Sequence, residues 1–224
     1  MNTSVRLNKF LALQLGISRR EADELIEKGR VQLGSSTATL GDRVTLTDII
    51  YVDNKKIDSS QQYIYVLFNK PTGYVCSRRK QGGTPTIYNI LPKEYQALKP
   101  VGRLDKDSSG LLILTNDGDF AHKMTHPSFK KTKVYEVSLD KPLEPLHQQL
   151  ISDHGIKLDD GTSKFLVSKI NKNTYQVTMQ EGRNRQIRRT FAALGYTVTQ
   201  LHRVQFGPYL LDIPPAKHKL ITIS

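Results

Sequence analysis

Residues 102–118 constrain the fold of this chain more than any other stretch. They contain a continuous apolar run, Leu111 to Leu114, with a glycine before it and an Asn-Asp-Gly turn after it. Such a run between turn residues predicts a strand covered on both faces. Asp105 precedes the run and therefore lies at the edge of a core, where burial favours the neutral carboxyl group unless a cation keeps it ionised. Arg103 and a later arginine cluster are the candidate cations.

The cysteine content limits the chemistry. Cys76 is the single cysteine among 224 residues, so an internal disulfide is excluded, and no clustered Cys/His spacing indicates a zinc site. This favours a reducing compartment, and we expect a cytoplasmic protein. The first 17 residues lack the uninterrupted apolar segment of a signal peptide, and no run approaches the length of a membrane span. We therefore expect no membrane partner. For the oligomeric state, a monomer is the default expectation.

The positive charge is unevenly distributed. Residues 1–60 contain nine Lys/Arg and eight Asp/Glu, whereas residues 61–224 contain 24 and 13, for a net charge of +12. A basic excess of this size indicates a nucleic-acid partner, and solubility alone is the alternative explanation.

A polar stretch, residues 53–62, predicts a linker between two regions. In the first region, apolar spacing predicts a helix over residues 7–15 that ends at Gly16. Ser18 and Glu21 form a capping box for a second helix, which ends at Gly29. Short strands are expected at residues 31–33 and 44–46.

Arg19 and Arg20 occupy the first turn of the second helix, where the helix dipole disfavours positive charge. Two arginines beside free helix N–H groups predict a phosphate site, and Arg6 and Lys9 on the first helix are expected next to it. Exposed arginines that a helix start merely tolerates are the alternative.

This region resembles an S4 RNA-binding domain. The resemblance covers about residues 5–52, within a domain expected to span residues 1–58. Four motifs support it, namely Arg-Leu-Asn-Lys-Phe, Gly-Ile-Ser-Arg-Arg-Glu-Ala, Ile-Glu-Lys-Gly-Arg-Val and Gly-Asp-Arg-Val. The resemblance implies an α-L-like fold, with Arg30 joining Arg6, Lys9, Arg19 and Arg20 on the RNA-binding face.

The second region, residues 63–224, is expected to be α+β. Alternating and β-rich segments predict strands, and short apolar spacings predict helices packed on a mixed, largely antiparallel sheet. The strands are expected at residues 63–68, 133–139 and 175–179, and the helices at residues 120–124, 145–151 and 185–194.

Four arginines follow Glu181 at the start of the last helix. Ile187 and Phe191 define the buried face of that helix, so Arg188 flanks the apolar stripe and points toward a carboxylate. The other three, Arg183, Arg185 and Arg189, are then expected to be free to contact phosphates, with a solvated basic helix as the alternative.

Together these motifs resemble the pseudouridine synthases of the small-subunit ribosomal RNA type, which have an S4 domain before the catalytic domain. The matching motifs are Phe-Asn-Lys-Pro-Thr-Gly-Tyr-Val, Gly-Arg-Leu-Asp-Lys-Asp-Ser-Ser-Gly-Leu, Lys-Val-Tyr-Glu-Val and Glu-Gly-Arg-Asn-Arg-Gln-Ile-Arg-Arg. The resemblance implies conversion of one uridine in ribosomal RNA, or in a ribosome assembly intermediate, to pseudouridine without a cofactor or metal.

The amino-acid sequences of residues 73–77 and 201–203 favour the small-subunit ribosomal RNA as the substrate. A large-subunit enzyme and a non-catalytic S4-type assembly factor remain as alternatives.

The resemblance also implies roles for individual residues. Asp105 falls on the catalytic aspartate of the family and acts either as a nucleophile or as a base at the sugar. Arg188 pairs with Asp105 and keeps it charged, and Tyr135 stacks on the uracil. Arg103 is expected to act as a wedge or a phosphate contact when the uridine leaves its stack.

Nearby carboxylates suggest a rival chemistry. Asp105 and Asp107 form a DxD arrangement that suits Mg²⁺ in an RNA-cleaving site. His122, His126 and His202 are expected to be structural or to contact RNA, because no spacing among them is typical of metal ligands.

Overall fold

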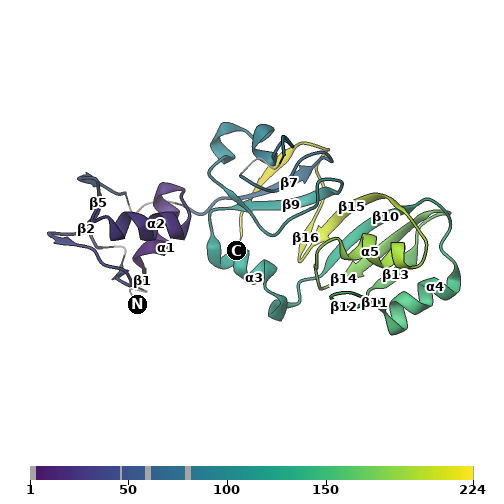
Figure 1. Cartoon of the computed structure of the whole chain (residues 1–224). Coiled ribbons are helices and arrows are strands. Elements are labelled where there is room, and N and C mark those ends of the chain that lie inside the picture. Colours follow the sequence, from purple (N-terminus) through teal and green to yellow (C-terminus); the bar gives the residue numbers. More distant parts are fainter. Residues whose placement is uncertain (1–3, 46, 59–61, 79–81, 224) are drawn as a thin grey trace. The chain divides into compact units, whose positions relative to one another are not determined.

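The computed structural model describes residues 4–45, 47–58, 62–78 and 82–223. Contacts between residues divide the chain into two compact units, Met1–Ile64 and Tyr65–Ser224. Figure 1 labels the helices and strands of both units. None of the helices in the described ranges combines the length and the apolar character that a membrane crossing requires.

The first unit contains two helices and short strands. In chain order these are β1 (Val5–Arg6), α1 (Leu7–Leu15), α2 (Arg19–Glu27), β2 (Val31–Leu33), β3 (Ser36–Thr37), β4 (Arg43–Val44), β5 (Ile50–Val52) and β6 (Lys55–Lys56). The strands form a sheet in the order β3-β2-β5-β6 and a separate β1-β4 pair.

Local sequence explains both helices of this unit. Gly16 ends α1 in the left-handed conformation with φ of 68°, which costs a glycine little. The side chain of Ser18 accepts a hydrogen bond from the Glu21 N–H at 3.1 Å, and Glu21 accepts one from the Ser18 N–H at 2.6 Å, so the predicted capping box is present. Leu11 and Ala22 from the two helices are fully buried in the small core.

Two expectations for this unit need adjustment. The stretch predicted as a linker begins with a β-hairpin, because Asp53 and Asn54 take positive φ and allow β5 to pair with β6. The strand expected at residues 44–46 appears as β4, and Leu46 lies outside the described residues.

The second unit contains the larger sheet. Its strands are β7 (Tyr65–Lys70), β8 (Lys99–Pro100), β9 (Ser109–Thr115), β10 (Lys133–Leu139), β11 (Ile156–Leu158), β12 (Gly161–Ser163), β13 (Leu166–Lys169), β14 (Thr174–Met179), β15 (Val198–Phe206), β16 (Tyr209–Leu210) and β17 (His218–Ile221). Its helices are α3 (Gly118–Thr125), α4 (Pro145–Gln149) and α5 (Gln186–Ala193), together with short helical turns that include Pro127–Phe129.

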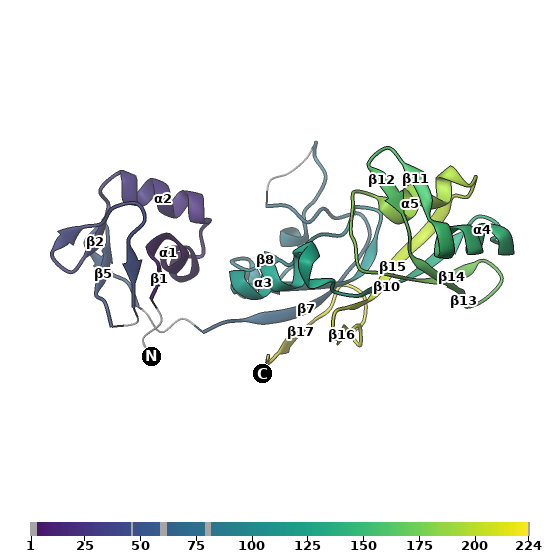
Figure 2. The ribbon, with the colours of Figure 1, turned by 90° about the horizontal axis from the view of Figure 1, so that it is seen from below.

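The main sheet has the order β13-β14-β10-β15-β9-β7-β17, with β16 paired to β15 and β8 to β9. Among these pairs β9 and β15 are parallel and the others are antiparallel. This confirms the predicted α+β class with a mixed, largely antiparallel sheet. Figure 2 shows the same elements from below.

The apolar run of residues 111–114 lies at the centre of this sheet. The four residues Leu111 to Leu114 are completely buried in β9, which has β7 on one side and β15 on the other. On one face of the sheet, α5 packs through Ile187 and Phe191, both buried as predicted (Figure 1). This packing holds the start of α5 near the loop that enters β9.

Candidate active site

The loop that enters β9, residues 102–108, is fixed by backbone hydrogen bonds. The Ser108 N–H donates to the Asp105 carbonyl at 3.1 Å, and the Gly73 N–H donates to the Lys106 carbonyl at 2.8 Å. Leu104 is buried beneath the loop. The loop therefore has a defined conformation in which Asp105 is half-buried.

Lys70, at the end of β7, supports this loop from below. Its side chain is completely buried, and its ammonium group donates to the carbonyl oxygens of Pro71 at 3.0 Å, Asp105 at 3.1 Å and Ser108 at 2.7 Å. These three acceptors match the three N–H groups of an ammonium ion. Burial lowers the pKa of Lys70, and the nearby Cys76, Asp105 and Asp107 act in the opposite direction.

From the sequence, the cation near Asp105 was expected among the arginines, and Lys70 was not identified. The signal was present, because Lys70 directly follows a run of buried strand residues and precedes a proline. A charged residue inside an apolar strand is rarely buried unless its charge is compensated.

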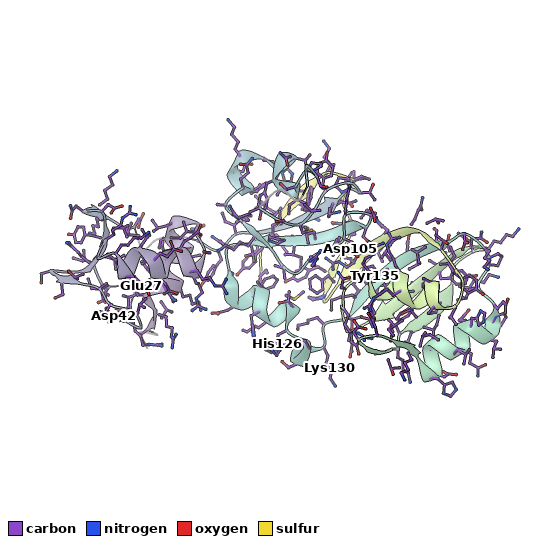
Figure 3. The ribbon with its side chains drawn as sticks, viewed as in Figure 1. Glu27, Asp42, Asp105, His126, Lys130 and Tyr135 are labelled. Carbon is purple, nitrogen blue, oxygen red and sulfur yellow. The ribbon has the colours of Figure 1, made fainter. Side chains whose placement is uncertain are left out.

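Asp105 and Tyr135 line the same pocket. Tyr135 lies in β10 and is 8% exposed. The pocket has a volume of about 180 Å³, and Figure 3 labels both residues within it. Its lining also includes Arg103, Ser108, Met179, Asn184, Arg185 and Leu201. The structure therefore brings the two residues together from separate elements, the loop before β9 and the strand β10, which β15 separates from β9.

Arg188 does not pair with the Asp105 carboxylate. Its guanidinium donates to the Val198 carbonyl at 2.8 Å and to the Asp107 carbonyl at 2.9 Å. Burial lowers the pKa of Arg188, with Arg185 acting in the same direction and Asp107 and Asp105 against it. The ion pair implied by the family resemblance is thus replaced by contacts that fix the backbone of the Asp105 loop.

Asp105 and Asp107 line different hollows. Asp105 lines the pocket with Tyr135, whereas Asp107 lines a separate groove with Glu136 and His202. Within the described ranges, no three His, Cys, Asp or Glu side chains cluster in a way that fits a metal ion. The DxD arrangement considered from sequence is therefore divided between two hollows and forms no three-ligand cluster in the described residues.

Two of the arginines expected to be free are paired. Arg183 forms an ion pair with Asp160 at 2.8 Å and donates to the Thr162 carbonyl at 2.8 Å. Arg189 pairs with Asp159 at 2.5 Å and with Asp160 at 2.6 Å. These contacts tie the start of α5 to the β11–β12 hairpin, so both side chains have a structural role that the charge pattern alone did not indicate.

Arg103 and Arg185 remain exposed at the pocket. Both line it, and both are more than a third exposed. Arg185 takes a left-handed backbone conformation with φ of 46° and approaches the Asp107 carboxylate at 3.4 Å, a long contact. These two side chains form the basic rim of the pocket.

In the first unit, Arg19 and Arg20 are exposed in the first turn of α2, as expected, and Arg6 is exposed at the start of α1. Lys9 is half-buried on the same helix. Arg30, which the family resemblance assigns to the RNA-binding face, forms a two-point ion pair in which its Nε donates to the Asp53 carboxylate at 2.7 Å. This pair raises the pKa of Arg30 and lowers that of Asp53.

Arg6 also lies beside acidic residues. A small hollow on the first unit is lined by Arg6, Asp23, Glu27 and Asp42, and the last two are labelled in Figure 3. Arg6 therefore has acidic side chains around it.

Arg203 is a second buried cation that the sequence did not reveal. It is 2% exposed in β15, donates from Nε to the Leu111 carbonyl at 2.8 Å, and lies 4.7 Å from the centre of the Phe206 ring. Its neighbour His202 shares a hydrogen bond of 2.8 Å with the Ser109 hydroxyl. Both contacts join β15 to β9 directly behind the Asp105 loop.

The two units together define an RNA-modifying enzyme with a separate RNA-binding domain. Residues 64–193 match the RNA pseudouridylate synthase family, and residues 5–50 match the S4 domain. The chain therefore belongs to the RNA pseudouridylate synthase family and is a pseudouridine synthase with an N-terminal S4 domain.

Similar proteins support this assignment. The chain is 37% identical over 210 residues to ribosomal large subunit pseudouridine synthase B of Bacillus subtilis (strain 168), covering 90% of this chain and 85% of that protein. It is 38% identical over 226 residues to the protein of the same name from Escherichia coli (strain K12), covering 96% and 76%. A crystal structure of a pseudouridylate synthase matches with a TM-score of 0.69 and 30% identity, covering 97% of this chain and 96% of that one.

These relatives do not support the preference for the small subunit. Both are named for the large ribosomal subunit. The short motifs that favoured the small-subunit enzyme are therefore poor indicators of the target, and the relatives favour the large-subunit alternative.

Proposed function

We propose that this enzyme converts a uridine of large-subunit ribosomal RNA to pseudouridine, with Asp105 as the catalytic residue. The observation that supports the proposal most directly is the pocket in which the half-buried Asp105 faces the space beside Tyr135. The names of the relatives supply the RNA class.

The reaction requires few protein groups. The bond from N1 of uracil to C1′ of the ribose breaks, the base turns, and C5 joins the same C1′. The proton on C5 is then lost, and N1 gains one, so no atom enters or leaves in total. Glycosidases use two carboxylates because water becomes part of the product. Since no water is added here, one aspartate is sufficient.

Asp105 acts at the sugar, either as a nucleophile at C1′ or as a base. Its carboxylate is available because Arg188 and Lys70 hold the loop through backbone carbonyls and leave the side chain facing the pocket. The loop is thus fixed in advance, which lowers the cost of placing the reacting groups.

Tyr135 provides an apolar surface for the detached base. An aromatic ring holds a uracil by stacking, and stacking permits rotation in the plane of the ring. The target uridine leaves its helix to enter the pocket. Arg103 is exposed at the entrance, where it contacts the RNA backbone or fills the space left by the base.

The remaining RNA contacts are assigned to exposed cations. Arg185 at the rim and Arg19 and Arg20 on α2 are suited to phosphates. Lys9 lies on α1, and Arg6 lies directly before that helix. Arg30, Arg183 and Arg189 support RNA binding indirectly, by stabilising the hairpins to which they are bound.

The proposal is tested by tritium release from large-subunit ribosomal RNA labelled at uridine C5. We expect release by the wild type and none by Asp105→Asn, with RNA affinity retained. Asp107→Asn is the comparison, because Asp107 lines the other groove and its backbone carbonyl still accepts from Arg188. We expect this variant to release tritium, with any change confined to RNA affinity through its 3.4 Å contact with Arg185.

Two further arms separate the alternatives. Release only from small-subunit RNA would reject the proposed target, and release by Asp105→Asn would reject the proposed mechanism. Each assay is run with and without a chelator. Loss of activity when the chelator is present would favour the hypothesis that the DxD arrangement binds Mg²⁺.

A further inference from the structure

Three exposed rings lie together outside the pocket. His122 and His126 are four residues apart at the end of α3, and their ring centres are 4.8 Å apart. Phe129, in the short helical turn that follows, lies 5.9 Å from His122 and 6.3 Å from His126. We refer to His122, His126 and Phe129 as the ring platform.

The exposure of the ring platform is unusual for its composition. Phe129 is 45% exposed, although a phenylalanine gains about 1.5–3 kcal/mol from full burial. Both histidines are exposed as well. The rings contact one another, and each presents part of its surface to solvent.

The elements beneath the ring platform are well anchored. Met124 of α3 is buried in a core cluster with Val101, Leu111 and Phe206, and Phe120 packs against that cluster. The Asp117 carboxylate caps α3 by accepting from the Phe120 N–H at 3.1 Å. The rings are therefore held on a fixed helix, which reduces the entropy lost when they bind a partner.

One ring is also held in its orientation. Nδ1 of His126 lies 2.8 Å from the Ser128 hydroxyl and 3.3 Å from the Ser128 backbone nitrogen. The ring is therefore an oriented aromatic surface, and its other nitrogen, Nε2, can take part in a hydrogen bond with a nucleobase.

Two connections place the ring platform near the pocket. Thr125, the last residue of α3, packs against Gly102, since a Cβ at Gly102 would lie 3.4 Å from the Thr125 methyl group. Gly102 precedes Arg103 on the pocket rim. On the other side, Tyr135 follows Phe129 by six positions, so their Cα atoms are at most about 20 Å apart.

The charge around the ring platform is positive. Lys123 and Lys130 are exposed and Lys131 is half-buried, and no salt bridge to an acidic side chain is found for them in the part of the chain that the structure describes. Lys130 adopts a left-handed conformation with φ of 43°, which is strained for a residue with a Cβ. Figure 3 shows His126 and Lys130 below Asp105 and Tyr135 in that view.

We propose that the ring platform stacks on an unpaired base of the substrate RNA that flanks the uridine in the pocket, while Lys123 and Lys130 contact the adjoining phosphates. Exposed rings interleaved with lysines match the requirements of single-stranded RNA, which offers a stacking face and a phosphate at each nucleotide. The inference rests on the proposed function and adds a second, separate contact with the same RNA.

The test compares Phe129→Ala and His126→Ala with the wild type on a large-subunit ribosomal RNA transcript, by equilibrium binding and by tritium release. Loss of one stacked base weakens binding by about 5- to 150-fold. We expect the KM to rise within that range and kcat to stay near the wild-type value, because neither residue lines the pocket.

Matched variants separate stacking from charge. Phe129→Leu keeps an apolar side chain without a ring and is expected to behave like Phe129→Ala. The slope of log K against log salt is negative, and Lys130→Ala is expected to make it shallower by about 0.7, whereas Phe129→Ala leaves it unchanged. Leu146→Ala, at another exposed apolar residue, which lies in α4, is expected to have no effect.

The outcomes distinguish the two proposals. If the wild type releases tritium and the Phe129 and His126 variants bind and react as the wild type does, the ring platform has no role in RNA binding. Unchanged binding to naked RNA with weakened binding to a ribosomal particle would also overturn the inference, in favour of a protein contact. Absence of release by the wild type would instead reject the proposed function, and the binding measurements would still decide on the platform.

Discussion

The ammonium group of Lys70 lies 3.1 Å from the backbone carbonyl oxygen of Asp105. The buried positive charge thus lies close to Asp105 and contacts its backbone, not its carboxylate. Such an arrangement supplies a favourable electrostatic environment and fixes the loop, while the carboxylate remains open to the substrate.

Replacing Lys70 with methionine is expected to lower both stability and activity. The variant leaves the carbonyls of Pro71, Asp105 and Ser108 without their charged donor, at a cost of about 3 kcal/mol. Urea unfolding measures the loss. Lys106→Met is the control, because Lys106 is exposed on the same loop; equal stability of the two variants would show that the buried contacts contribute little.

Arg188→Lys is expected to reduce kcat far more than it changes the KM. A lysine has one terminal nitrogen and is a poor replacement for the two that contact the Val198 and Asp107 carbonyls, 2.8 and 2.9 Å away. The Asp105 loop then shifts, and a displacement of about 1 Å costs on the order of 100-fold in rate. Steady-state kinetics on labelled RNA checks this.

Arg185→Lys is the comparison for Arg188→Lys. Its side chain is exposed on the pocket rim and makes one long contact with Asp107. We expect a change confined to RNA affinity, and a kcat loss as large as that of Arg188→Lys would contradict the positioning role.

The sequence predicted those parts of the fold that depend on local patterns. The run Leu111 to Leu114 predicted the central strand β9, and the Ser18–Glu21 pair predicted the start of α2, because apolar burial and helix capping are determined by nearby residues. The strand predicted at residues 63–68 appears two residues later, as β7, where pairing with β9 decides its bounds.

The partners of charged residues were harder to predict. Arg183 and Arg189 look alike in sequence to Arg185, yet Asp160, more than twenty residues away, pairs with the first two and not with the third. The role of Lys70 likewise depends on a loop 35 residues away. Such contacts are set by how the sheet brings distant segments together, which single-sequence patterns do not encode.

His202 is expected to make stability depend on pH. Burial lowers the pKa of His202 from its usual value of 6.5, with Glu136 acting in the opposite direction. The unfolded chain therefore binds a proton at a higher pH than the folded protein does, so this contribution is present above pH 6.5 and is lost as the pH falls. His202→Gln is expected to flatten the profile below pH 6.5, and an unchanged difference in melting temperature over that acidic range would refute the assignment.

Gly110→Ala is expected to disrupt the centre of the catalytic unit. Gly110 pairs with Arg203 in the parallel β9–β15 ladder, and a Cβ at Gly110 would lie 2.3 Å from the Arg203 carbonyl oxygen and 2.5 Å from its nitrogen. Its φ of 105° adds backbone strain for any other residue. The two strands must separate to admit the methyl group, at a cost of about 2–5 kcal/mol.

Gly118→Ala is the matched control for this substitution. Gly118 is the first residue of α3, no atom lies within 4 Å of a Cβ placed there, and its φ is not positive. Alanine at that position is expected to leave stability unchanged or to raise it slightly, because alanine favours the helix over glycine. If chemical denaturation shows the same stability for both variants, then β9 and β15 can separate without loss, and the close approach behind the Asp105 loop does not constrain the site.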